Sequence, residues 1–327
     1  MPVVLDPSPE HVAECAARLK RGLAVAFPTE TVYGLGCDST SEPAVSAVYA
    51  LKGRPPSNPL IAHVLDAAMA KKSVIGWDVR AQRLADAFWP GPLAIVLPRR
   101  AEICAASVGG RTTVAVRAPA HPVARALIAA FGGPVSAPSA NRSGRVSPTT
   151  AAHVAEEFAD VADLPILDGG SCEVGLESTV LALSRARPMI LRPGAVTAAD
   201  LEPIIGPVAA PVIGGQASSP GTSPWHYAPL TPCVRVAAEE LAARLATETG
   251  TVAVVAPAGT RVDAPHELLA MPHHAAAYAQ LLYATLRKAD AMGAALIAIV
   301  PPKETGGLWD AAHDRIRRAT ARRPAGA

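Results

Sequence analysis

Two stretches of the chain combine basic side chains with features of a binding site for a phosphate or carboxylate. The first, LKGRPPSNPLIAHV (residues 51–64), places Lys52 and Arg54 on either side of a glycine, just before a proline-rich loop that contains Asn58. Prolines fix the backbone of such a loop, as a preset binding loop requires. Basic residues at a helix C-terminus also complement the helix dipole, so these two cations alone leave both interpretations open.

The second stretch, GRTTVAVRAPAHP (residues 110–122), places an arginine on an apolar strand. Thr113 and Arg117 are separated by an even number of residues, so they share one face of a regular strand. Buried arginine is rare unless it is paired, and Arg117 therefore needs a carboxylate or phosphate partner from the protein or from a ligand. His63 also lies in an apolar segment, where a histidine is by itself more often a core residue than a ligand.

Two further stretches are rich in hydroxyl and amide groups that can hold phosphate or ribose. In PVSAPSANRSGRVSPTT (residues 134–150), Ser147 could instead be the N-cap of a helix that begins at Pro148. The other stretch is DGGSCEVGLESTVLAL (residues 168–183), followed by ILRPGAVT (residues 190–197). In it Arg192 ends a strand beside a turn, where a solvated arginine is the commoner interpretation. No Ser/His/Asp or Cys/His arrangement for a catalytic nucleophile is visible. The pattern therefore favours catalysis by substrate positioning and charge neutralisation over covalent catalysis. The polar residues of interest are Ser136, Ser139, Asn141, Ser143, Ser147, Ser178 and Thr179.

The elements that must position these residues alternate between short apolar strands and helical segments. A length of 327 residues favours about two domains. The mixture predicts an α/β domain over 1–205, followed by a Gly/Ser/Pro-rich linker over 206–232. An idle linker has little use for the aromatic cluster Trp225, His226 and Tyr227.

The remaining residues, 233–327, alternate regularly between strand and helix patterns. This order predicts a small parallel sheet flanked by helices. In its longest helix an apolar face is expected to contain Tyr278, Leu281, Leu282, Leu286 and Ala289. Neither GxGxxG nor a Walker A motif occurs there, so nucleotide binding by this part is not supported.

Composition narrows the class of protein. Half of the residues are hydrophobic, 18% are charged and the net charge is +2, which is typical of a globular chain without a global field for nucleic acid. No apolar run approaches the ~18–20 residues that span a bilayer, and MPVVLDPSPEHV lacks signal-peptide features, so a cytoplasmic location is expected. The cysteines form no CxxC pair, which predicts reduced, mostly buried thiols and no zinc site: Cys15, Cys37, Cys104, Cys172 and Cys233.

The order of the motifs resembles a known family. FPTETVYGLG, KGRPPSNPL, WPGPLAIVL, TVAVRAPAHP, APSAN, ESTV and LRPG follow one another as in the YrdC-like domain. The later SPGTSPWHYAP and its α/β tail are similar to the long form of threonylcarbamoyl-AMP synthase, so the resemblance covers nearly the whole chain. It implies a twisted mixed-sheet domain with an open cavity, plus a smaller Rossmann-like parallel α/β domain.

That family condenses L-threonine, bicarbonate or CO2, and ATP into threonylcarbamoyl-AMP and pyrophosphate. Downstream proteins then transfer the threonylcarbamoyl group to tRNA. The resemblance implies Mg²⁺ bound with ATP, no metal ligands from protein side chains, and a linker that acts as a lid. Catalytic roles are implied for Lys52 and Arg54. L-Threonine contacts are implied for Thr31, His63, Arg117 and Ser178, and ATP contacts for Lys52, Arg54, Asn58, Thr113, Ser139, Asn141, Ser147, Arg192 and Tyr227.

In this interpretation FPTETVYGLGCDST (residues 27–40) forms one wall of the active site, where Gly34 and Gly36 let the backbone approach closely. Thr29, Glu30 and Tyr33 are expected either to brace this loop or to touch substrate.

Two alternatives involve other functions. One is a double-stranded RNA or tRNA binding module, although 4% aromatic residues leave few stacking platforms. The arginines near the C-terminus could then contact phosphates, but a solvated helical face is the preferred interpretation for Arg315, Arg317, Arg318, Arg322 and Arg323. The other is carbamoyl transfer in hydrogenase maturation, where zinc-finger-like cysteine pairs accompany the domain and none occurs here.

Overall fold

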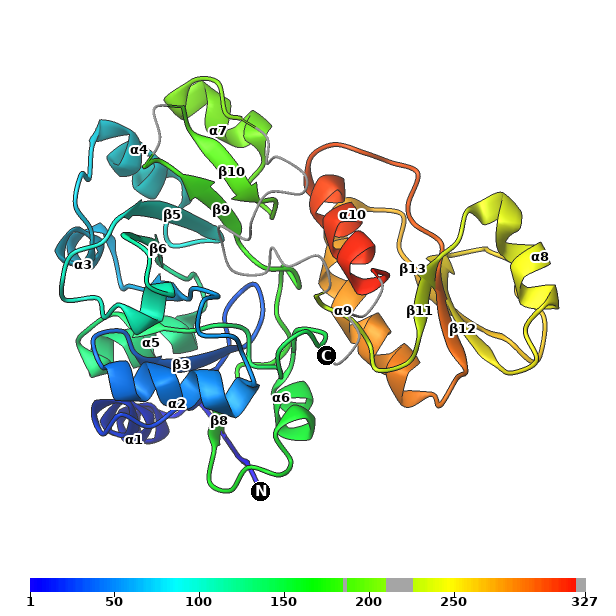
Figure 1. Ribbon diagram of the computed structural model, residues 1–327, viewed down its shortest axis with the longest axis horizontal. Coiled ribbons are helices and arrows are strands. Elements are labelled where there is room, and N and C mark those ends of the chain that lie inside the picture. The colour runs from blue at the N-terminus through cyan, green and yellow to red at the C-terminus, as the bar shows by residue number, and fades with distance from the viewer. Residues whose placement is uncertain (185–186, 210–225, 322–327) are drawn as a thin grey trace.

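The computed structural model describes residues 1–184, 187–209 and 226–321. These residues form two sheets, a mixed one of ten strands and a parallel one of four (Figure 1). The fold class expected from the sequence is therefore confirmed. The domain boundaries 1–205, 206–232 and 233–327 stay predictions, and Trp225, Arg322 and Arg323 lie outside the described residues.

The larger sheet has parallel and antiparallel neighbours in the order β1-β8-β2-β3-β7-β4-β6-β5-β9-β10. Its strands are β1 (Val3–Leu5), β2 (Val25–Phe27), β3 (Gly34–Asp38), β4 (Ile61–His63), β5 (Leu93–Pro98), β6 (Thr113–Arg117), β7 (Val135–Ser136), β8 (Pro165–Leu167), β9 (Thr179–Ala182) and β10 (Met189–Arg192). The associated helices are α1 (Pro9–Lys20), α2 (Glu42–Lys52), α3 (Ala67–Ser73), α4 (Val79–Phe88), a 3₁₀ turn (Ala106–Val108), α5 (Pro122–Phe131), α6 (Ala151–Glu157) and α7 (Ala198–Ile205).

A hairpin of β2 and β3 organises the loop that the sequence singled out. The hydroxyl of Thr29 donates to Val32 O at 2.7 Å and accepts from the backbone N–H groups of Thr31 and Val32. Such side-chain-to-backbone bonds define a tight turn. The chain then enters β3, a strand that the sequence analysis took for part of the loop.

The expectation that Gly34 and Gly36 permit close backbone approach is confirmed, but at Gly36 the neighbours are core side chains. A Cβ at Gly36 would lie 2.7 Å from Cε1 of Phe27 and 2.9 Å from Cγ1 of Val135. At Gly34 it would lie 3.2 Å from Ala137 Cβ. Glycine is needed at position 36 because a side chain there would overlap packed neighbours, and at position 34 a Cβ would be tightly crowded.

Alternation along β4 and β6 explains why polar residues gather on one face of the sheet. Ala62 and Val116 join the core formed with α3, α4 and α7. Ile61 and Ala115 point the other way, into a cluster to which no described helix contributes. His63 and Arg117 follow the same alternation as Ile61 and Ala115, so side chains at these strand ends project from the face that no described helix covers.

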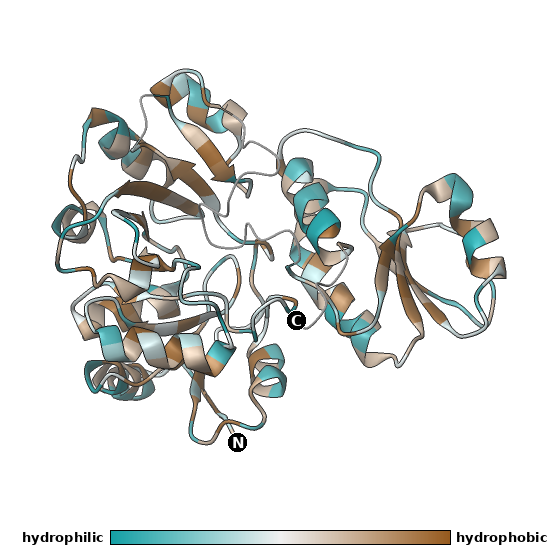
Figure 2. Cartoon of the chain, viewed as in Figure 1, coloured by the Kyte–Doolittle hydropathy of each residue, from teal (hydrophilic) through white to brown (hydrophobic). Residues whose placement is uncertain are grey.

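The second sheet has the order β11-β14-β12-β13, and all its pairs are parallel. Its helices α9 and α10 lie on the side toward the larger sheet, and α8 lies on the other side (Figure 1). Figure 2 shows that the strands are mostly hydrophobic, whereas the helices carry both hydrophobic and hydrophilic residues. The elements are β11 (Cys233–Arg235), a 3₁₀ turn (Ala238–Glu240), α8 (Leu241–Ala246), β12 (Val252–Pro257), β13 (Glu267–Met271), α9 (Ala275–Ala291), β14 (Leu296–Ile299) and α10 (Leu308–Ala319).

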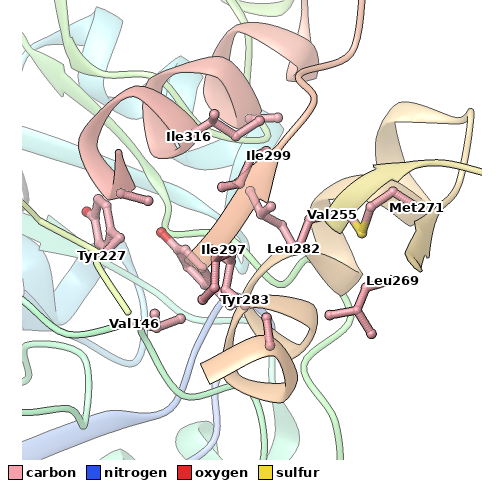
Figure 3. Packing of buried hydrophobic residues seen from close by; sticks show 14 of the residues in the cluster. Val146, Tyr227, Val255, Leu269, Met271, Leu282, Tyr283, Ile297, Ile299 and Ile316 are labelled. Carbon is pink, nitrogen blue, oxygen red and sulfur yellow. The ribbon is translucent and has the colours of Figure 1, made fainter. Parts of the chain in front are cut away.

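The core around α9 and α10 also includes residues that precede the second sheet in the sequence. Val146 and Tyr227 pack with Tyr283, Leu282 and other buried side chains (Figure 3). Two parts of the chain that are distant in sequence therefore share one apolar core.

Three expectations about local structure are wrong. Leu281 is not on the buried face of α9, because the side chain is 43% exposed while Leu282 is fully buried. The helix after the 134–150 stretch begins at Ala151 with Thr150 as its N-cap, so Ser147 is not the cap. Arg315 is not on a solvated face, because its exposure is 0%. The thiols are mostly buried, as expected: Cys15, Cys37 and Cys172 are buried, whereas Cys104 and Cys233 are partly exposed.

The adjacent leucines of α9 give a test of this core. We expect Leu282→Ala to lower the free energy of unfolding by about 2–5 kcal/mol, because it removes packed methyl groups and leaves a cavity. Leu281→Ala, on the same helix, should change it by less than about 0.5 kcal/mol because its side chain is solvated. Urea unfolding followed by circular dichroism measures both, and equal losses would contradict the packing described for α9.

Candidate active site

One cavity is lined by many of the buried polar and charged side chains of the molecule. It encloses about 510 Å³ of space, including its opening to solvent. The walls come from the β2–β3 loop, the ends of β4 and β6, the loop after β7, the residues around β9 and β10, and the segment after the undescribed linker residues. The lining residues are Thr29, Thr31, Val32, Gly34, Arg54, Ile61, His63, Arg117, Ala137, Pro138, Ser139, Glu177, Ser178, Arg192, His226 and Tyr227.

Arg117 is buried at the end of β6 and has a partner within the protein. Its guanidinium lies 2.7 Å from the carboxylate of Glu30 and donates to the hydroxyl of Thr31 at 2.9 Å. Burial alone would raise the pKa of Glu30, but the charge and hydrogen bonds of Arg117 hold it below its usual range. The partner that the burial of Arg117 required is thus a protein carboxylate. Of the two roles expected for Glu30, bracing the loop or touching substrate, this ion pair supports the first.

His63 lies beside Arg117 because β4 and β6 pair in parallel with these two residues in register. Burial lowers the pKa of His63 to about 3, and the neighbouring Arg117 adds to this effect. Its Nδ1 is buried without a hydrogen-bond partner among the described residues. A neutral imidazole with a free nitrogen can accept or donate one hydrogen bond to a bound molecule.

Two buried basic residues lie at the end of helix α2: Lys52 is its last residue, and Arg54 follows the C-cap Gly53, which has a left-handed conformation (φ 60°). Lys52 donates to the carbonyl oxygens of Ser139 and Asn141, so it holds the loop after β7 and does not line the cavity. Arg54 lines the cavity and donates to the carbonyl oxygens of Asn58 and Pro59. Burial lowers the pKa of Arg54 to about 10, well above neutral pH, so it stays charged.

The start of β9 forms the opposite wall. Arg192 from β10 donates to the carbonyl oxygen of Ser178 at 3.0 Å and to its hydroxyl at 3.1 Å. The commoner interpretation of Arg192, a solvated strand end, is wrong because its exposure is only 4%. Next to Ser178 the carboxylate of Glu177 accepts a hydrogen bond from Ser147 at 2.6 Å. Ser147 therefore contacts a wall residue rather than capping a helix.

The aromatic segment of the expected linker also contributes to the cavity wall. Tyr227 is 1% exposed, has a positive φ of 60° and has a buried hydroxyl without a partner among the described residues. Its ring lies next to His226, with 4.3 Å between centroids. The next residue, Ala228, donates its N–H to Gly144 O at 2.9 Å, which fixes this segment to the loop that carries Ser147. The expected lid residue thus lies on the cavity wall.

The structure brings together most, but not all, of the residues named from the sequence. Those that line the cavity are Thr31, Arg54, His63, Arg117, Ser139, Ser178, Arg192 and Tyr227. Those that lie outside the lining are Lys52, Asn58, Thr113, Asn141 and Ser147. The sequence analysis assigned no site role to His226 or Glu177, although Glu177 stands in the quoted ESTV motif and His226 in the aromatic cluster, and position in these motifs was the available signal.

The buried histidine predicts a pH effect on stability. The pKa of His63 is lowered on folding, so the unfolded chain binds a proton more readily, and stability is lost as pH falls below the unfolded value of about 6.5 toward 3. We expect this residue to account for about 2 kcal/mol of lost stability at pH 5 relative to pH 7. Urea unfolding at both pH values should show a correspondingly smaller loss in His63→Asn. An unchanged loss would contradict the neutral buried state.

Two family models match the chain. The one described as "Telomere recombination" matches residues 17–194, and the one described as "Threonylcarbamoyl-AMP synthase, C-terminal domain" matches residues 196–321. Within residues 1–184, 187–209 and 226–321, no helix combines the length and the apolar composition that a membrane span requires.

Relatives of known name and structure agree with these matches. The threonylcarbamoyl-AMP synthase of Pyrococcus abyssi is 38% identical over 324 residues, which cover 94% of this chain and 93% of the relative. That of Bacillus subtilis is 42% identical over 235 residues, covering 70% and 67%. The structure of P. abyssi Sua5 complexed with L-threonine has a TM-score of 0.89 at 36% identity, covering 98% of this chain and 97% of that one. The chain belongs to the threonylcarbamoyl-AMP synthase family.

Proposed function

We propose that this protein is an L-threonylcarbamoyladenylate synthase, which condenses L-threonine, bicarbonate or CO2, and ATP to threonylcarbamoyl-AMP and pyrophosphate. The observation that carries the proposal is the convergence of three buried arginines, Arg54, Arg117 and Arg192, on one cavity. A cavity with this charge suits substrates that carry a carboxylate and phosphates. The name of the relatives, threonylcarbamoyl-AMP synthase, supports a product that joins a threonylcarbamoyl group to AMP.

The L-threonine subsite is proposed around the Arg117 wall. Thr31, His63, Arg117 and Ser178 all line the cavity, and the P. abyssi relative is known in complex with L-threonine. Because Glu30 already pairs with Arg117, the guanidinium is fixed in place before any substrate binds. A preorganised cation can receive the substrate carboxylate with little further loss of freedom.

The ATP subsite is proposed along Arg54, Ser139, Arg192 and Tyr227. Lys52 and Asn141 support this subsite from behind, because Lys52 donates to the carbonyl oxygens of Ser139 and Asn141. Contacts from Asn58, Thr113 and Ser147 would require movement of the segments that carry them, since none of the three lines the cavity.

Mg²⁺ is proposed to arrive with ATP and to be held by phosphate oxygens. The described residues contain no group of three or more His, Cys, Asp or Glu side chains placed to hold a metal ion. The carboxylates at the cavity are also engaged, Glu30 with Arg117 and Glu177 with Arg315. When bound, the ion would supply additional charge neutralisation at the phosphates.

The proposed chemistry has two bond-forming steps. The neutral threonine amine either adds to CO2 and releases a proton, or condenses with bicarbonate and releases water. Both routes give an N-carboxylate. One oxygen of this carboxylate attacks the α-phosphorus of ATP, and the bond to the leaving pyrophosphate breaks. Arg54 and Arg192 would stabilise the charge that develops, with charge-assisted hydrogen bonds of about 1.5–3 kcal/mol each. Lys52 would contribute through the loop that it holds.

The product is a reactive mixed anhydride and needs an acceptor. We propose that downstream proteins transfer its threonylcarbamoyl group to a tRNA adenosine, in the cytoplasm where ATP and tRNA are available. Direct tRNA binding by this chain is not required for the proposed activity.

The first test measures pyrophosphate release from ATP and bicarbonate with and without L-threonine. Release should depend on L-threonine and should fall by about 10-fold or more in kcat/KM with L-serine, because a buried methyl group contributes about 1–3 kcal/mol of discrimination. Release that is independent of the amino acid would contradict the proposed function.

The second test concerns the cation at the proposed phosphate subsite. We expect Arg54→Ala to lower kcat/KM for pyrophosphate release by about 10- to 100-fold, since it removes a charge-assisted contact. Arg261→Ala is the matched control, because Arg261 is 88% exposed and its ion-pair partner, Asp263, is also exposed. Wild-type turnover in Arg54→Ala, with a circular dichroism spectrum unchanged, would exclude Arg54 from the reaction.

A further inference from the structure

A buried carboxylate on the cavity wall is held mostly by the C-terminal part of the chain. Glu177 lines the cavity and is 5% exposed. Its Oε2 accepts from the hydroxyl of Tyr283 at 2.8 Å and from Nε of Arg315 at 2.9 Å. Its Oε1 accepts from Ser147 at 2.6 Å. Two of its three side-chain partners therefore come from α9 and α10, which flank the second sheet.

The same two residues hold the tyrosine on the wall. The ring of Tyr227 lies 5.5 Å from that of Tyr283, and the guanidinium carbon of Arg315 lies 5.3 Å from the centroid of Tyr227 (Figure 3 shows Tyr227 and Tyr283). A cation at this distance from an aromatic face is attracted to it. Tyr283 and Arg315 thus contact two wall residues while lying outside the cavity lining themselves.

The position of the Glu177 backbone determines where its neighbours Ser178 and Arg192 lie. Glu177 precedes Ser178, to which Arg192 donates two hydrogen bonds. The backbone of this segment packs tightly against Gly194, where a Cβ would lie 2.7 Å from Glu177 O and 2.4 Å from Thr179 N. Close packing of this kind transmits small shifts, so a displaced Glu177 would move Ser178 and Arg192 together.

We propose that Tyr283 and Arg315 are positioning residues for the amino-acid subsite, acting through Glu177. This inference rests on the proposed function and extends it, because it makes the C-terminal part of the chain a contributor to substrate binding. Helix packing alone does not explain Arg315. Its Nη1 pairs with Asp314, which is already bound by Arg317 and Arg318, while its Nε is directed to Glu177 across the shared core.

Tyr283→Phe is the sharpest test because it removes one oxygen and keeps the ring that stacks on Tyr227. We expect the KM for L-threonine to rise about tenfold with kcat within about threefold of wild type, since a hydrogen bond to a charged group is lost. Tyr278→Phe is the matched control on the same helix. Tyr278 is 1% exposed, and its hydroxyl has no partner among the described residues, so this variant should keep both wild-type values.

Arg315 is tested by a graded pair of variants. Arg315→Met removes the charge from Glu177 and should raise the KM for L-threonine by more than Tyr283→Phe, whereas Arg315→Lys keeps a positive charge and should restore part of the loss. If Tyr283→Phe keeps the wild-type KM, or if Tyr278→Phe loses as much as Tyr283→Phe, the positioning role is wrong.

The failure of this inference can be told apart from failure of the proposed function. Absence of L-threonine-dependent pyrophosphate release in the wild-type protein would contradict the function itself. Calorimetric titration of L-threonine into the wild-type, Tyr283→Phe and Tyr278→Phe proteins then decides the positioning role without turnover. A tenfold weaker Kd in Tyr283→Phe alone supports it, and equal Kd values in all three overturn it.

Discussion

The buried carboxylate of Glu177 is the constraint on which the arrangement of this molecule depends. Burial alone would raise the pKa of Glu177, but Arg315 and then Arg192 hold it below the usual range, with hydrogen bonds from Ser147 and Arg315 adding to their effect. A charge with so little access to water must be fully partnered, because an unpaired buried ion costs several kcal/mol. One partner, Ser147, belongs to the first part of the chain, and two, Tyr283 and Arg315, belong to the helices of the second sheet. Glu177 therefore joins the two parts of the chain at the cavity wall.

A second buried pair fixes the other side of the cavity by the same rule. Glu30 neutralises Arg117, and the Thr29 turn holds the short loop between β2 and β3 in the shape that places Glu30 there. The cavity is therefore lined by cations whose positions are set by protein carboxylates and carbonyl oxygens. Substrate can then replace water around groups that are already oriented, which lowers the cost of binding and of charge development.

Much of the fold follows from local patterns, and the site follows from them less completely. Alternation predicts that Thr113 and Arg117 share a face, but only the sheet shows that His63 lies in register beside Arg117 while Thr113 stays outside the cavity. The motif order predicts that Arg54 and Arg192 belong to one site, and they meet there. The same order assigns Ser147 to ATP, which stays a prediction, and the structure adds that Ser147 donates a hydrogen bond to Glu177.

The sequence by itself determined the fold class, the parallel second sheet and the identity of half of the residues that line the cavity, because strand and helix periodicity and motif order are local properties of the chain. The tertiary structure alone decided the partner of each buried charge. Glu30 pairs with Arg117, and Arg315, which was expected on a solvated helical face, is buried and pairs with Glu177. Such pairings depend on strand register and helix packing between residues far apart in sequence, and no local pattern encodes them.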